Sequence, residues 1–145
     1  MDTKILVAYA SGSGSTREVA EAIANEFKKL GLATVIQNAD EVDSIASFSG
    51  IVIGSSIRIG RWLPEAVACL EHIKAEVGDR PVAYFTTCLT MVDDTKKNRQ
   101  TVLDYMEPLL IKIAPEITPI GLGLFAGSLD PGRQAVMVSD GPHGA

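Results

Sequence analysis

Several features that define common protein classes are absent from this sequence. Its 145 residues include only two cysteines, with no Cys-x-x-Cys pair and no His-Glu-x-x-His motif, so a disulfide framework and a four-ligand metal site are excluded. No apolar stretch approaches the roughly 20 residues that a membrane span needs, and nothing at the amino terminus resembles a signal peptide. We therefore expect a cytoplasmic protein with no transmembrane segment and no bound metal.

Clustered positive charge is also absent. The 13 Lys and Arg residues are mostly dispersed, and the net charge is -5. A surface that binds nucleic-acid phosphates needs dense groups of Lys and Arg. We therefore expect no nucleic-acid partner.

What the sequence does have is enough apolar material for one domain, since 46% of its residues are hydrophobic. Strand-like apolar runs alternate with segments of helical periodicity, which predicts a parallel sheet covered by helices on both faces. The expected strands are 4–10, 33–37, 50–56, 81–87 and 117–125, and the expected helices are 16–30, 63–77 and one from near Arg99 or Thr101 to Ile113. The fold class is a doubly wound α/β domain over residues 1–127, followed by a short tail at 128–145.

Four residues mark features of these elements that a structure can test. Leu30 completes the apolar stripe of the first helix, and Gly31 ends that helix. Pro108 predicts a kink or a break in the third helix because proline lacks a backbone donor. For the same reason, Pro119 suits a strand at the edge of the sheet.

The segment between the first strand and the first helix reads SGSGST. It lies at the carboxyl end of a central strand, where open α/β sheets bind ligands. Its glycines allow successive backbone N–H groups to point into one concavity, and the positive end of the helix attracts an anion. The expected phosphate-binding residues are Ser11, Gly12, Ser13, Gly14, Ser15 and Thr16.

Two other phosphate motifs are excluded at this loop. A nucleoside triphosphate loop, GxxxxGK[ST], and a dinucleotide fingerprint, GxGxxG, both need glycine where Arg17 stands. A cradle for one phosphate monoester is what remains. The alternative is a serine-capped turn that only starts a helix.

With this loop and this order of elements, the sequence resembles the flavodoxin family along roughly residues 4–127. In that family a hydroxyl-x-hydroxyl-Gly-x-Thr loop holds the phosphate of FMN. The resemblance implies a five-stranded sheet in the order 2-1-3-4-5, with the flavin ring over the loops after the third and fourth strands. GSSIRIG at 54–60 and GLGLFAG at 121–127 are similar to the branch that contains menaquinone-dependent protoporphyrinogen oxidase.

The resemblance places the flavin ring against two loops. The expected cofactor-binding residues are Ser56, Ile57, Arg58, Gly60 and Trp62 in the first loop, and Thr87, Cys88, Leu89, Thr90 and Met91 in the second. Apolar side chains such as Ile57 and Ile59 would wall the ring, and Gly60 could turn a carbonyl toward the flavin N5. Trp62 has a competing role as a core anchor of the following helix, and Cys88 as a small packing residue. No residue is assigned as a general acid or base.

Arg58 and Arg61 place positive charge in the first of these loops. One unit charge about 4 Å from the ring contributes at most roughly 4 kcal/mol at a surface-like dielectric. For a two-electron couple, this energy corresponds to at most on the order of 90 mV. The predicted direction is upward, toward quinone or substrate redox. Alternatively, either arginine only pairs with a surface carboxylate, or one of them holds a substrate carboxylate.

In the family a last helix follows the fifth strand. Here the tail contains Pro131, Gly132, Gly141 and Pro142, which leave little room for a helix. We therefore expect the last helix to be missing or truncated. An apolar strip beside the first helix would then be buried by a second copy, making a homo-oligomer, or by another chain.

Three functions are compatible with these expectations. The first is an FMN-dependent oxidoreductase domain that passes electrons between the flavin and a quinone-like or tetrapyrrole-like partner. The second is a flavodoxin-type electron carrier that serves a protein partner. The third is a flavin-free interaction module that has kept the fold.

Overall fold

The computed structural model describes residues 3–11, 15–58, 60–88, 95–125 and 136–139. The strands are β1 (Lys4–Ala10), β2 (Ala33–Asn38), β3 (Gly50–Arg58), β4 (Arg61–Trp62), β5 (Val82–Thr87), β6 (Gly121–Phe125) and β7 (Val136–Ser139). The helices are α1 (Ser15–Lys29), α2 (Pro64–Ile73) and α3 (Lys96–Ile113), with a 3-10 turn η1 (Ala39–Glu41) after β2.

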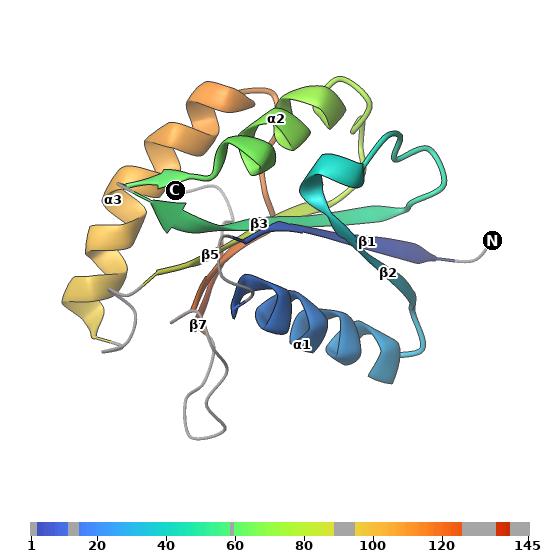
Figure 1. The fold of residues 1–145 in the computed structure, drawn as a ribbon, viewed down its shortest axis with the longest axis horizontal. Helices are drawn as coiled ribbons and strands as arrows, with labels where there is room; N and C mark the ends of the chain where they lie inside the picture. Colours follow the sequence, from blue (N-terminus) through green and yellow to red (C-terminus); the bar gives the residue numbers. More distant parts are fainter. Residues whose placement is uncertain (1–2, 12–14, 59, 89–94, 126–135, 140–145) are drawn as a thin grey trace.

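Five strands form the parallel body of the sheet, in the order β2-β1-β3-β5-β6. In chain order of the parallel strands this is 2-1-3-4-5, so the predicted topology is confirmed. Two short strands are additional: β4 forms an antiparallel hairpin with β3, and β7 pairs antiparallel with β6. Helix α1 covers one face of the sheet, and α2 and α3 cover the other (Figure 1).

Each face of the sheet carries its own apolar core. The core under α2 and α3 includes Ile53 and Tyr84, whereas the core under α1 includes Val52 and Phe85. These neighbours along β3 and β5 point to opposite faces because side chains alternate along a strand. Gly54 is required between the two strands, since a Cβ atom there would collide with the ring of Phe85.

Three expectations about helices are wrong. Helix α2 ends at Ile73, before the expected end at Val77, because residues 74–76 form a turn. Leu30 is 74% exposed, because α1 ends at Lys29 and Leu30 lies in the turn that Gly31 completes with a φ of 83°. Helix α3 begins earlier than expected, at Lys96, because the Thr95 side chain accepts a hydrogen bond from the Asn98 N–H and caps the helix. The helix end expected at Gly31 is confirmed.

At Pro108 the break that the sequence allowed is not observed, and Pro119 does not lie in a strand. Helix α3 continues through Pro108 without a break, and the proline lies on its exposed side. Pro119 precedes β6, which is shorter than the predicted strand, and β7 occupies the edge position beside it. The tail expected to lack the last helix lies mostly outside the described residues, so the second copy remains a prediction.

Candidate functional site

Three neighbouring parallel strands, β1, β3 and β5, end on one side of the sheet. We call this side the carboxyl edge, formed by residues 10–11, 55–58 and 86–88. The register pairs Ala10 with Ser55, and Ser55 with Thr86. The three loops that the sequence singled out therefore leave the sheet from neighbouring positions, as ligand-binding loops of open α/β sheets do.

Buried hydroxyl groups gather at this edge. Thr16, Ser55, Thr86 and Thr87 are each at most 2% exposed, and they are the buried polar side chains found among the described residues. A buried hydroxyl without a hydrogen bond is destabilising, so such groups are expected to have partners. Each of the four side chains takes part in a hydrogen bond to another segment of the chain, and Ser55 also donates to the carbonyl of the next residue.

The first of these bonds joins the start of α1 to the end of β5. The Oγ1 atoms of Thr16 and Thr87 lie 2.9 Å apart, in a buried contact between residues 71 positions apart in sequence. A hydroxyl has one hydrogen and two acceptor sites. When Thr87 donates to Thr16, the hydrogen of Thr16 stays available for another acceptor at the positive end of the helix.

The other bonds hold the β3–β4 hairpin. The indole N–H of Trp62 donates to Thr86 Oγ1 at 2.9 Å, and the backbone N–H of Leu63 donates to Ser55 Oγ at 3.0 Å. Adjacent threonines of β5 thus serve opposite faces of the sheet, Thr86 toward β4 and Thr87 toward α1. Ser55 and Thr86 begin the two loops over which the flavin ring is expected, but neither was predicted to bind the cofactor. Hydroxyl groups that end apolar strands are a signal that could have singled them out.

Trp62 lies in the core. It is 3% exposed and packs edge-on against Tyr84, with ring centroids 5.6 Å apart. Of the two roles that the sequence allowed, this position agrees with the core anchor, because a wall for a ligand ring needs an accessible face.

The turn at the tip of the hairpin has a backbone conformation that agrees with the role expected of Gly60. Ile57 pairs with Trp62 and Arg58 with Arg61, which leaves two residues in the turn. Gly60 has a φ of 71°, in the region that favours glycine. This conformation is compatible with a carbonyl that turns toward a ligand.

The structure describes only part of the predicted site. Ser11, Ser56, Ile57 and Cys88 are partly exposed at the carboxyl edge, and Ser15 begins α1. The Cys88 backbone N–H donates to the Phe125 carbonyl at 3.0 Å. Outside the described residues lie Gly12, Ser13, Gly14, Ile59, Leu89, Thr90 and Met91, and the side chains of Ser15 and Arg58 are not described either.

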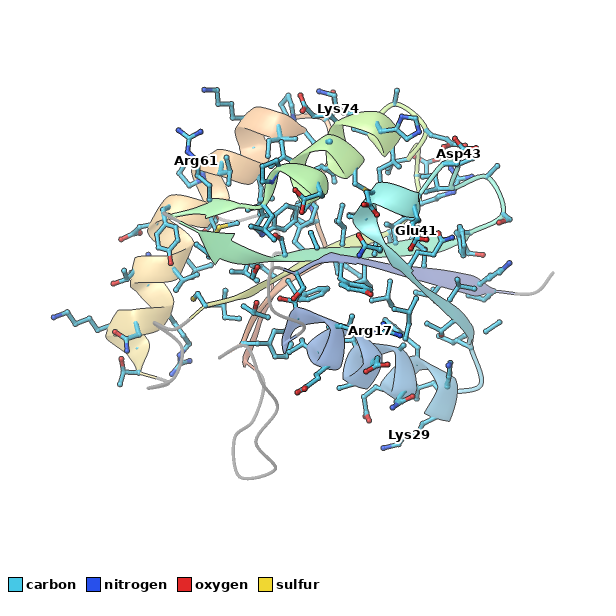
Figure 2. The ribbon with its side chains drawn as sticks, viewed as in Figure 1. Arg17, Lys29, Glu41, Asp43, Arg61 and Lys74 are labelled. Carbon is cyan, nitrogen blue, oxygen red and sulfur yellow. The ribbon has the colours of Figure 1, made fainter. Side chains whose placement is uncertain are left out.

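Arg61 supplies accessible positive charge beside the edge. Its side chain is exposed at the hairpin, and within the described ranges it makes no ion pair (Figure 2). The interpretation that Arg61 pairs with a surface carboxylate therefore finds no support in these residues. By contrast, the other cysteine, Cys69, is buried on α2, and burial raises the pKa of its thiol to about 11, which suits a packing residue.

These features fit a ligand that combines a phosphate with a flat ring. The buried hydroxyl of Thr16 lies at the positive end of α1, and Ile57 and Cys88 remain partly accessible. No group of three or more His, Cys, Asp or Glu side chains within the described segments could hold a metal ion.

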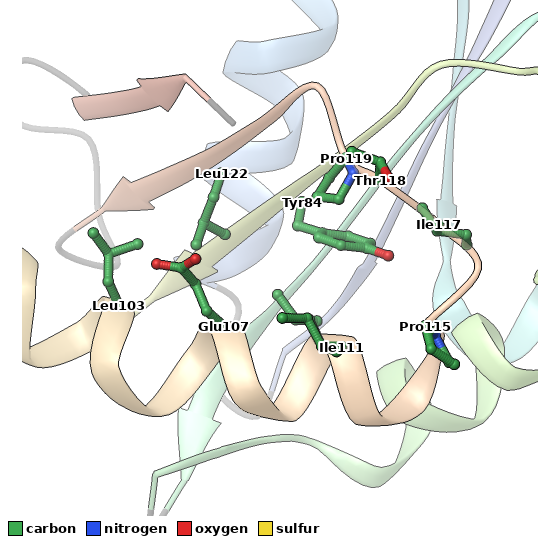
Figure 3. Close-up of a pocket in the computed structure, with 10 residues that line it drawn as sticks. Tyr84, Leu103, Glu107, Ile111, Pro115, Ile117, Thr118, Pro119 and Leu122 are labelled. Atoms are coloured by element: carbon green, nitrogen blue, oxygen red, sulfur yellow. The ribbon is translucent and has the colours of Figure 1, made fainter. Parts of the chain in front are cut away.

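A second concavity lies on the other part of the sheet, between α3 and the chain that enters β6 (Figure 3). We call it the α3 groove and define it by Tyr84, Leu103, Glu107, Ile111, Pro119 and Leu122. Its volume is about 300 Å³ and its walls are mainly apolar. None of the cofactor-binding residues predicted from the sequence lines it.

Comparison with known proteins identifies the fold and the family. The family model described as a flavodoxin domain matches residues 6–136. A flavodoxin from Megasphaera elsdenii superposes with a TM-score of 0.65 at 16% identity, covering 88% of this chain and 90% of that one. Flavodoxin 2 from Bacillus cereus gives 0.58 at 24% identity, with 91% and 88% covered.

Among curated proteins, the chain is similar to the protoporphyrinogen IX dehydrogenase [quinone] of Escherichia coli strain K12. The two are 26% identical over 100 residues, which is 68% of this chain and 55% of the relative. The chain thus spans about half the length of the curated relatives that it matches. In the described part of the chain, no helix combines the length and apolar character needed to cross a membrane.

Proposed function

The chain belongs to the flavodoxin domain family, and on this premise we propose that it is an FMN-dependent oxidoreductase domain acting on a quinone-like or tetrapyrrole-like partner. Membership of the family indicates FMN as the cofactor. The observation that carries the proposal is the Thr16–Thr87 hydrogen bond, because it fixes the start of α1 at the place where three strand ends meet.

We assign the phosphate to the start of α1 and the ring to the loops after β3 and β5. The phosphate would be held by Ser11, Gly12, Ser13, Gly14, Ser15 and Thr16, and the ring by Ser56, Ile57, Arg58, Gly60, Thr87, Cys88, Leu89, Thr90 and Met91. Bound FMN supplies the electron transfer, whereas the chain binds, orients and electrostatically tunes it. Trp62 supports the ring loop from the core and has no accessible face for stacking.

The partner class is supported by charge and by a relative. Arg61 is an exposed cation beside the predicted ring site, so it would raise the potential and attract an anionic or carboxylate-bearing partner. The curated relative is named for protoporphyrinogen IX and a quinone. Since only 55% of that relative is spanned, the same partners are a hypothesis for this chain.

The second candidate is a flavodoxin-type electron carrier. It is favoured by the match to the Megasphaera elsdenii flavodoxin, which covers about nine tenths of both chains. A carrier needs no substrate pocket, because its partner is another protein. The flavin-free module remains the third alternative.

Purification and redox titration separate the three functions. We expect a yellow protein with FMN bound, which titrates near a single two-electron potential and whose reduced form is oxidised by a soluble naphthoquinone. Two well-separated one-electron potentials, with no quinone reaction, would instead establish the carrier. A colourless protein that takes up no added FMN would overturn both redox functions.

A further inference from the structure

The α3 groove is separate from the carboxyl edge, although β5 contributes to both. Tyr84 forms part of its floor and lies three residues before Thr87, or about 10 Å along the strand. The opposite wall is the segment before β6, which includes Pro119 (Figure 3). At about 300 Å³, the groove is at the lower limit of small-molecule sites and admits one or two rings.

One charged side chain interrupts the apolar wall that α3 presents. Leu103, Glu107 and Ile111 follow each other at intervals of four residues, so they lie on one face of the helix and point into the groove (Figure 3). Glu107 is half-buried, and its carboxylate makes no hydrogen bond or ion pair within the described residues. A carboxylate in these surroundings favours an occupant that brings a cation or an N–H donor.

The backbone of the facing wall offers few free N–H groups, although Thr118, which also lines the groove, brings a side-chain hydroxyl. Pro115 and Pro119 have no backbone N–H, and the N–H groups of Ile117 and Ile120 already donate to the carbonyls of Ala114 and Val82. At these four residues, therefore, no backbone N–H is left to donate to an occupant. The two prolines also restrict its backbone, so the wall is formed before any ligand arrives.

From these features we infer that the α3 groove binds a small amphiphile with an apolar, ring-sized body and a cationic amine that meets Glu107. The apolar body fills the space over Tyr84, Leu103 and Leu122. The amine pairs with the carboxylate at the middle of the α3 face. Ile111, which is 62% exposed, extends the apolar wall to the rim.

The test uses three probes of nearly equal size: 2-phenylethylamine, 2-phenylethanol and 3-phenylpropionate. Binding to the full chain is followed by NMR of the methyl groups of Leu103, Ile111 and Leu122. We expect the amine to shift these methyls with a Kd of about 1 mM, a weak value typical of so small a ligand. It should bind at least about threefold more tightly than the alcohol, since a partly exposed ion pair adds only modestly, and the propionate should bind most weakly.

Glu107→Gln should remove the preference for the amine over the alcohol. Its matched control is Glu71→Gln, which makes the same change at an exposed position on α2 and should leave the preference intact. Ile111→Ala removes apolar wall at an exposed position, so the fold should survive and all three probes should bind more weakly.

The proposal is overturned if no probe shifts the groove methyls, if the amine and the alcohol bind equally to the native chain, or if Glu107→Gln keeps the preference. Because the readout does not involve the flavin, these outcomes are independent of the proposed redox function.

Discussion

The carboxyl edge and the α3 groove place polar groups in opposite ways. At the edge, four buried hydroxyl side chains are hydrogen-bonded, and they fix the positions of α1, β4 and β5. In the groove the walls are apolar, and the carboxylate of Glu107 has no partner within the described residues. Polar groups that are hydrogen-bonded to each other fix the relative positions of the elements that carry them. A polar group without such a partner is available to bind a ligand.

Strand β5 shows how both regions arise from one short sequence. Tyr84 and Thr86 face α2 and α3, where Tyr84 lines the groove and Thr86 accepts the bond from Trp62. Phe85 and Thr87 face α1, where Thr87 meets Thr16. Substitutions that disturb one region and spare the other therefore test whether the two are independent.

The largest effect is expected from Gly54→Ala, which should disrupt the edge. The new methyl group would collide with the Phe85 ring and push β3 away from β5, displacing the adjacent Ser55. We expect a loss of about 3 kcal/mol or more in the free energy of unfolding, at the upper end for overpacked cores. Urea denaturation measures it.

Gly50→Ala is the matched control in the same strand. A Cβ atom there would lie 3.1 Å from the flexible end of Ile5, which can move, so the loss should be clearly smaller. Equal losses for the two variants would show that close approach of β3 and β5 at Gly54 is not the cause.

The next effect concerns Thr87→Val, which keeps the side-chain shape but removes the bond to Thr16. We expect FMN affinity to fall about tenfold, since Thr16 loses the partner that directs its hydroxyl toward the phosphate. Affinity for riboflavin, which has no phosphate, should change little. Flavin fluorescence quenching measures both, and Thr87→Ser should restore FMN binding.

Thr86→Val provides the comparison within the same pair of threonines. It breaks the bond to Trp62 on the other face, so any loss of affinity should be equal for FMN and riboflavin. If Thr86→Val also weakened FMN selectively, the Thr16–Thr87 contact would not be a specific support of the phosphate site.

A smaller effect is expected in the groove, from Glu107→Leu. An apolar side chain should occupy part of the free space and stabilise the fold by about 1 kcal/mol, with flavin affinity unchanged. Thermal unfolding measures the change, and Glu71→Leu, at an exposed position, should give none. A destabilised Glu107→Leu variant would show that the carboxylate already has a favourable environment.

The sequence predicted the order of the sheet and the place of the site because both depend on local patterns. Apolar runs such as β1 alternate with helical periodicity, and the glycine- and serine-rich loop follows the first strand. The start of α3 was predicted too late, near Arg99 or Thr101, although Thr95 is of a residue type that commonly caps helices.

What the sequence could not supply were contacts between distant segments. The same residue type at Thr86 and Thr87 has different partners because alternation sends one to each face. Trp62 suited a ring wall as well as a core anchor until its neighbour Tyr84 was known. The groove depends on how α3 packs beside the chain entering β6, and no pattern in either segment encodes that spacing.

The smallest effect is expected for Arg61→Gln, which removes the exposed cation beside the predicted ring site. Because water screens an exposed charge, the contribution is about 1 kcal/mol at most, so the two-electron potential should fall by no more than about 20 mV. The shift should shrink as salt is added. Lys29→Gln removes a cation that Figure 2 places on the other side of the molecule, and it should leave the potential unchanged. If Arg61→Gln left the potential as unchanged as Lys29→Gln does, Arg61 would not tune the flavin. A raised KM for an anionic quinone in Arg61→Gln would then show that Arg61 acts in partner binding alone.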